Sequence, residues 1–165
     1  MVKIKYLLAY SLLTASLYAC AQSRYSIKNS YAFYKVHLPG NIAVDEHGNE
    51  IPATDTLYFV YVETSTELIQ WNVAWKNDKT YSILSHLADT NFIDAGSDKI
   101  TNERMIIHAS PGNKLWQLRL IPTDNKISTP IKILPGEILI KGTYNGKIIL
   151  KKIKKEVELN SISSQ

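Results

Sequence analysis

The pair Asn145-Gly146 is the feature that most restricts what this chain can fold into. It lies between two segments rich in aliphatic and β-branched residues, 138–144 and 147–153. Asn-Gly favours the type I′ turn, in which both central residues have positive φ, and the twist of that turn matches the twist of two paired strands. The sequence therefore predicts an antiparallel hairpin over residues 138–153.

Turn signals recur along the rest of the chain. Three Pro-Gly pairs, Pro39-Gly40, Pro111-Gly112 and Pro135-Gly136, suit type II turns, because proline presets φ at the second position and glycine supplies a positive φ at the third. Short segments rich in Ile, Val, Thr and Tyr lie between the turns and are typical of strands. The further strands predicted are 32–38, 57–63, 69–76, 79–84, 105–109, 115–121 and 130–134.

These segments predict an all-β fold, an antiparallel β-sandwich or small barrel of about eight or nine short strands. One short helix is expected over 82–92, where Ile83, Leu84, Leu87 and Ala88 recur at helical spacing. The polar segments 45–49 and 94–104 are expected to be loops. Alternation in 69–76 places Trp71 and Trp75 on one face of a half-buried strand, although Leu68, Trp71 and Trp75 also fit helical spacing.

The amino terminus has the layout of a bacterial secretory signal. Lys3 and Lys5 precede an uncharged stretch, 6–19, that is too short to span a bilayer as a stable helix. Cleavage is expected at one of two overlapping sites around Cys20, the only cysteine. One is Ala19-Cys20-Ala21, an A-x-A site whose use would release a soluble chain beginning at Gln22.

The other site, Leu17-Tyr18-Ala19-Cys20, resembles the lipobox of bacterial lipoproteins. The resemblance covers the signal only, and Tyr18 departs from the residues usual at its position. It implies that the Cys20 thiol is acylated and that Cys20 becomes the amino terminus of the mature protein. Dual acylation gives stable membrane anchoring. The lipoprotein is the favoured alternative, because the single cysteine stands at the lipobox position.

The expected organisation is a signal peptide at 1–19, a tether at 20–30, one β-rich domain at 31–160 and a tail at 161–165. About 145 residues follow the signal, a usual size for one domain. Such a domain buries enough surface to fold without disulfides. The net charge of +4 falls to +2 when Lys3 and Lys5 are removed with the signal, which does not favour a nucleic-acid partner.

Five lysines crowd near the carboxyl terminus: Lys147, Lys151, Lys152, Lys154 and Lys155. Lysines are a common protection against edge-to-edge strand pairing, and this is the favoured interpretation. The alternative is a patch for an anionic lipid, an acidic polysaccharide or a protein partner.

Signatures of catalysis are not found in the sequence. His37, His47, His86 and His108 have no metal-ligand spacing, and Asp89, Asn91, Asp94 and Asp98 fail the EF-hand pattern. No serine stands in a G-x-S-x-G motif and no glycine-rich phosphate loop is present. The sequence therefore predicts no catalytic residue, no metal site and no cofactor, and favours a non-enzyme.

Trp71, Trp75 and Trp116 are the candidate ligand-binding residues, since aromatic rings combine an apolar face with a polar tip and can stack on a glycan. Packing in the core is the favoured alternative. The function expected is a periplasm-facing envelope lipoprotein, a non-catalytic binding or assembly module for a protein or glycan. The alternatives are a soluble secreted hydrolase and an inhibitor-like protein that plugs a groove with the loop 94–104.

Overall fold

Twelve strands account for the regular structure in the computed structural model, which describes residues 27–37, 43–44, 46–47, 50–51 and 55–161. The strands are β1 Ile27–His37, β2 Ala43–Val44, β3 Glu50–Ile51, β4 Asp55–Thr64, β5 Gln70–Lys76, β6 Lys79–Leu87, β7 Phe92–Ser97, β8 Arg104–His108, β9 Lys114–Pro122, β10 Ile138–Tyr144, β11 Lys147–Ile153 and β12 Glu156–Glu158. No helix is found within these ranges. The all-β prediction is confirmed.

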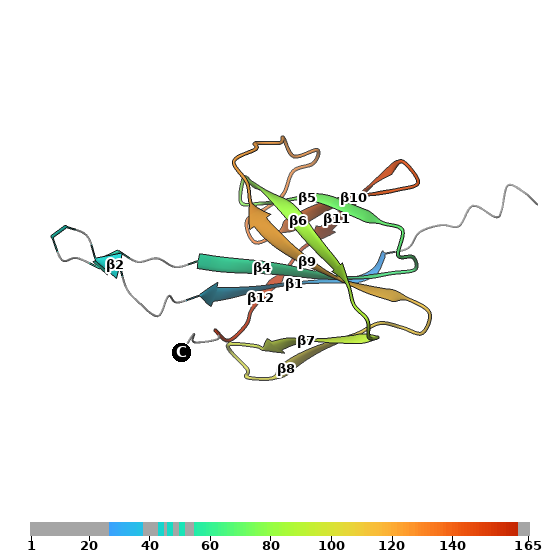
Figure 1. Ribbon diagram of the computed structural model, residues 1–165, viewed down its shortest axis with the longest axis horizontal. Helices are drawn as coiled ribbons and strands as arrows, with labels where there is room; N and C mark the ends of the chain where they lie inside the picture. The colour runs from blue at the N-terminus through green and yellow to red at the C-terminus, as the bar shows by residue number, and fades with distance from the viewer. Residues whose placement is uncertain (1–26, 38–42, 45, 48–49, 52–54, 162–165) are drawn as a thin grey trace, which may run out of the picture.

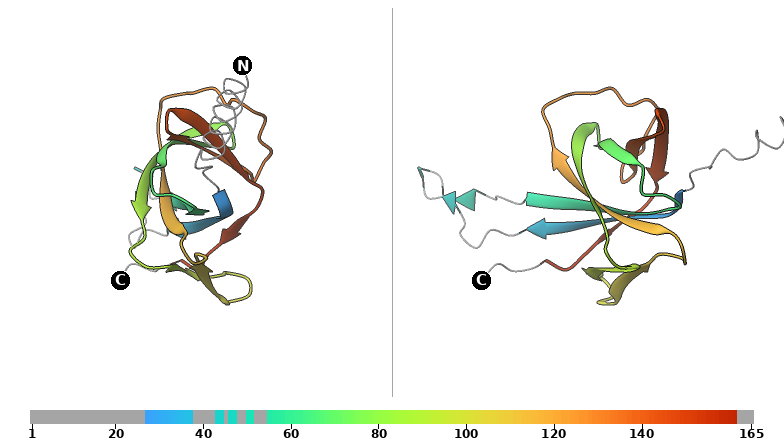
Figure 2. Two further views of the ribbon diagram at one scale, coloured as in Figure 1. Left: turned by 90° about the vertical axis from the view of Figure 1, so that its right-hand side faces the viewer. Right: turned by 45° about the vertical axis from the view of Figure 1, so that its right-hand side comes forward.

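Eight of the strands form one curled sheet in the order β11-β10-β5-β6-β9-β4-β1-β12, a half-barrel whose strands wind around a common axis (Figures 1 and 2). All neighbours are antiparallel except β1 and β12, which run parallel. β2 with β3 and β7 with β8 form two small hairpins. The two edge strands of the large sheet, β11 and β12, follow each other in the chain with only Lys154 and Lys155 between them. The curl of the sheet brings its two edges together.

The concave side of the sheet holds the main core. All strands of the large sheet except β12 contribute to it, because every second residue of a strand points to the same face of the sheet. Examples are Val60 and Val62 on β4, Leu118 and Leu120 on β9, and Ile140 on β10, all almost completely buried.

Two smaller cores lie on the convex side. The β7–β8 hairpin covers β1 and β4 there, and Ile107 packs with Phe33 and Tyr61. The segment 123–137 covers β5 and β10, with Ile133 against Trp75 and Leu139. Figure 1 shows these two covers at opposite ends of the molecule.

The predicted turns within the described residues are confirmed. Asn145 and Gly146 have φ of 49° and 72°, as a type I′ turn requires. Gly112 and Gly136 both have φ of 81°, as expected after proline in a type II turn. Pro39-Gly40 lies outside the described residues. Within the predicted loop 45–49, Glu46 and His47 form the turn between β2 and β3.

The helix predicted over 82–92 is wrong. Residues up to Leu87 belong to β6, which pairs with β9 along its length. Pairing with a distant strand overrides the local spacing, so Ile83 and Leu87 pack into the core while Leu84 between them is 58% exposed.

Two other predicted segments also differ. The predicted loop 94–104 begins with β7 and continues as a turn into β8, because Ala95 packs into the core beneath the hairpin. The predicted strand 130–134 is irregular, and it covers β5 and β10 rather than pairing with them.

The first strand begins before the expected domain boundary. Residues 27–30 belong to β1 rather than to the tether. The predicted signal peptide, Cys20 and the first part of the tether lie outside the described residues, as do residues 162–165 of the tail.

Candidate functional site

The three tryptophans are buried, so none offers an open ring face to a ligand. Trp71 and Trp116 pack edge to face in the main core, with ring centroids 6.5 Å apart. Trp75 lies on the convex side, where its Nε1 donates a hydrogen bond to the carbonyl of Ile127 at 2.7 Å. The core interpretation explains all three positions, and a glycan platform built on these rings is not supported.

Trp71 and Trp75 do not share a face, contrary to the alternation in the sequence. Lys141 of β10 pairs with Val73, but the next residue, Gly142, pairs with Trp71, which leaves Asn72 as a bulge. The extra residue turns Trp71 to the concave side, while Val73 and Trp75 stay on the convex side.

The histidines and acidic residues give no metal site in the described part of the chain, where no group of three potential ligands is found. His86 and His108 are exposed on separate strands. Asp98 instead accepts hydrogen bonds from the N–H groups of Ile100 and Thr101, which shapes the β7–β8 turn. Asp94 is paired with Arg104.

One ionisable group is deeply buried without a counter-ion. Glu63 is 1% exposed, and its carboxylate accepts hydrogen bonds from Asn29 Nδ2, Asn113 Nδ2 and the N–H of Ser110 at 2.6–2.8 Å. Burial alone would raise the pKa of Glu63, but these hydrogen bonds outweigh it and lower the pKa to about 2. Through these hydrogen bonds the carboxylate holds the 110–113 turn against β1 and β4.

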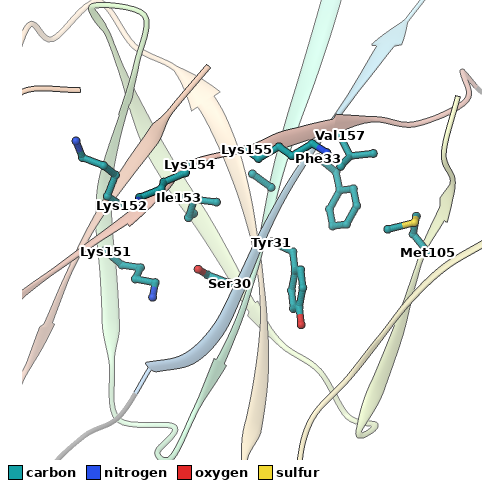
Figure 3. A pocket seen from close by; sticks show the side chains of 11 residues that line it. Ser30, Tyr31, Phe33, Met105, Lys151, Lys152, Ile153, Lys154, Lys155 and Val157 are labelled. Atoms are coloured by element: carbon teal, nitrogen blue, oxygen red, sulfur yellow. The ribbon is translucent and has the colours of Figure 1, made fainter. Parts of the chain in front are cut away.

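A cleft of about 370 Å³ opens where β11 and β12 meet β1. Its lining comes from three parts of the chain: Ser30, Tyr31, Ala32 and Phe33 of β1, Met105 of β8, and Lys151, Lys152, Ile153, Lys154, Lys155 and Val157 at the β11–β12 junction. Figure 3 shows the lysines of β11 on one side, Met105 at the opposite end, and Ser30 and Tyr31 between them. The cleft is therefore cationic on one side and apolar on the other.

The charges of the cleft are unbalanced, since four lysines line it and no acidic residue does. Lys152 is engaged with Glu137 at 2.9 Å and with the carbonyl of Lys132 at 2.7 Å. Lys151, Lys154 and Lys155 form no salt bridge with any residue that the structure describes. Lys154 and Lys155 lie near enough to Glu137 and Asp98 to help lower the pKa of those carboxyls, but none of the three ammonium groups is held in a direct ion pair.

Strand alternation explains why Lys151 faces the cleft. It has the parity of Ile149 and Ile153, which point to the concave side, and it pairs with the buried Ile140. Lys151 is half-buried and lines the cleft beside β1. β11 is an edge strand, as the protective interpretation of the lysines predicts, and an inward-pointing charge is one means of protection.

The sequence signalled only half of this site. The lysine cluster is visible as a run of like charges, but Ser30, Tyr31 and Met105 join it through long-range pairing that no local pattern reveals.

Within the described part of the chain, no helix has the length and hydropathy needed to cross a bilayer. Comparison with protein-family models, with curated proteins and with solved structures finds no match to this chain.

Proposed function

We propose that this protein is a non-catalytic binding module of the bacterial cell envelope, anchored through an acylated Cys20 and facing the periplasm, that recognises an acidic glycan. The anchor rests on the lipobox-like residues Leu17 to Cys20. The binding role rests on one observation, the cleft at the β11–β12 junction with its three unpaired lysines.

The chemistry of the lining fits a charged sugar. Ammonium groups attract carboxylate or phosphate groups, and hydrogen bonds between charged partners are about twice as strong as neutral ones. Ser30 and Tyr31 add hydroxyl groups that can bond to sugar hydroxyls. Tyr31 is 41% exposed, so part of its ring is open to stack on a sugar face. A volume of about 370 Å³ lies within the range of small-ligand sites.

No observation favours the two alternative functions. The described lining of the cleft contains neither a histidine nor a carboxylate that could serve as a general acid or base. The segment 94–104, expected to act as a plugging loop, is largely part of the β7–β8 hairpin, whose inner face is packed on the sheet.

Binding of tetragalacturonate, measured by isothermal titration calorimetry at low ionic strength, tests the proposal. The matched probe is its methyl ester, which keeps the sugar rings and removes the charges. We expect the acid to bind and the ester to bind at least tenfold more weakly. Replacing Lys151 and Lys155 by Gln should weaken binding of the acid about tenfold, which corresponds to about 1.4 kcal/mol.

The matched control replaces Lys79 and Lys126 by Gln, which removes the same charge from exposed positions outside the cleft. This variant should bind like the parent protein. Equal binding of acid and ester, or equal loss in both double variants, would contradict a specific site. Binding to phosphatidylglycerol vesicles without binding to the acid would show that the cleft serves a lipid headgroup instead.

A further inference from the structure

β5 and β6 leave their shared turn as a hairpin and then separate. They pair from Lys76 with Lys79 to Val73 with Ser82, and the pairing stops there. Figure 1 shows the two strands diverging beyond this point, where β6 continues beside β9. Residues 83–87 of β6 therefore have a neighbour on one side only among the described strands.

The bulge at Asn72 explains the separation. Continuing the hairpin register would place Trp71 opposite Leu84. Residues opposite each other in a sheet share a face, but the bulge turns Trp71 to the concave side while Leu84 lies on the convex side. β5 follows β10 beyond the bulge, and its register with β6 is lost.

Alternation of hydrogen bonding identifies the free groups on β6. The N–H of Ala88 donates to the carbonyl of Leu115 at 2.8 Å, so even-numbered residues of β6 bond toward β9. Ser85 and Leu87 therefore point their N–H and C=O groups away from β9, and no hydrogen bond joins these groups to another described residue. They form a short open edge.

This edge lacks the usual protection. Residues 80–88 contain no Lys, Arg, Asp, Glu, Pro or Gly, whereas the edge strand β11 carries three lysines. Proteins normally block exposed edges with charge, proline or bulges. An unprotected edge beside the 58% exposed Leu84 is therefore a ready site for another strand.

One charged group indicates what would fill the site. Arg119 lies opposite Leu84 on β9, is exposed, and forms no salt bridge within the described residues. It offers a positive charge on the same face as Leu84.

We propose that the open edge of β6 binds an extended segment of a partner protein, with apolar residues and one acidic residue, as an added β-strand. Main-chain bonds to Ser85 and Leu87 align the segment. Leu84 contacts its apolar side chains, and Arg119 selects its acidic one. This site is independent of the lysine cleft.

The probe is the capped peptide acetyl-Thr-Val-Thr-Glu-Thr-Val-Thr-amide, in which the two Val and the Glu lie on one face of a strand. Its binding is followed by NMR on the isotope-labelled protein. We expect amide hydrogen exchange at Ser85 and Leu87 to slow at least tenfold at saturating peptide. A peptide with Lys in place of Glu should bind several-fold more weakly, and Arg119→Gln should remove that preference. Leu84→Lys should weaken binding about tenfold.

Ser85→Pro deletes an edge donor and should abolish binding, while the matched variant Ser85→Thr keeps the donor and should bind normally. Leu84→Lys and Arg119→Gln keep the test valid if Ser85→Pro fails to fold, because both change exposed side chains. Unchanged exchange at Ser85 and Leu87, or a preference for Glu that survives Arg119→Gln, overturns the proposal. Protection that rises with protein concentration in the absence of peptide also overturns it, because the occupant is then a second copy.

Discussion

Glu63 is a buried residue whose hydrogen bonds connect three segments of the chain on the convex side. Its carboxylate joins β4 to Asn29 of β1 and to the turn before β9 through Ser110 and Asn113. The ionised form is the bound form, because all three partners donate hydrogen bonds. No charge pattern in the sequence distinguishes this Glu from Glu67, four residues later, which is half exposed and paired with Lys114.

Folding stability should therefore fall in acid. A carboxyl group whose pKa is about 2 in the folded state and 4.5 in the unfolded state stabilises the fold above pH 4.5 and loses that contribution as the pH falls toward 2. The contribution is at most about 3 kcal/mol. In chemical unfolding at pH 7, the free energy of unfolding of Glu63→Gln should be about 2 kcal/mol lower than that of the parent. When the pH is lowered, this free energy should fall less in the variant than in the parent.

Glu67→Gln is the control, since it removes the same charge from the surface. It should change the free energy of unfolding by less than about 0.5 kcal/mol. Equal acid sensitivity in the parent and in Glu63→Gln would show that other carboxylates, such as Glu137, control the response.

The bulge between β5 and β10 is the element that shapes one whole side of the sheet. Gly142 stands opposite it, and a Cβ there would lie 3.0 Å from the carbonyl oxygen of Gln70 and from Cε3 of Trp71. Glycine inside a strand commonly marks such close approaches. The bulge both turns Trp71 inward and separates β5 from β6.

Gly142→Ala should destabilise the fold by about 1–3 kcal/mol, because backbone and a buried ring must move. It should also shift the NMR signals of Ile69, Gln70 and Trp71. Gly146→Ala is the comparison, since its Cβ would meet nothing within 4 Å and its cost comes from φ alone. Wild-type stability and unshifted β5 signals in Gly142→Ala would contradict the proposed role of the bulge.

The sequence predicted correctly those elements whose conformation is set by their own residues. Asn145-Gly146 and the two described Pro-Gly pairs set their turns through their own φ preferences, so the flanking strands were predictable. β6 was only partly predicted, because 82–87 becomes a strand through pairing with β9. The faces of Trp71 and Trp75 depend on a bulge that alternation in the sequence does not show.

At the scale of the whole molecule, the sequence predicted the fold class but not the site. The strand composition and turn spacing were sufficient for an all-β prediction. The cleft is made by residues far apart in the chain, Ser30 and Tyr31 on one side and Lys151 to Lys155 on the other. Only the curl of the sheet brings them together.

The membrane anchor is a prediction for the whole protein. Mass spectrometry of the protein from its native membrane should find a chain that begins at acylated Cys20, with a mass increased by two or three acyl chains. The Cys20→Ser variant should carry no acyl chains and should no longer be found in the membrane fraction. An unmodified chain that begins at Gln22 would contradict the lipoprotein assignment.

The joining of the two sheet edges by β11 and β12 has a consequence for the order of folding. β12 pairs with β1, and the hydroxyl of Tyr34 donates to Glu158, which is 124 positions later in the chain. Contacts of such sequence separation are slow to form, because a long loop must close first. During synthesis or export, β1 can pair with β12 only after almost the whole chain has emerged. The closure of the sheet beside the cleft is therefore a late step in folding.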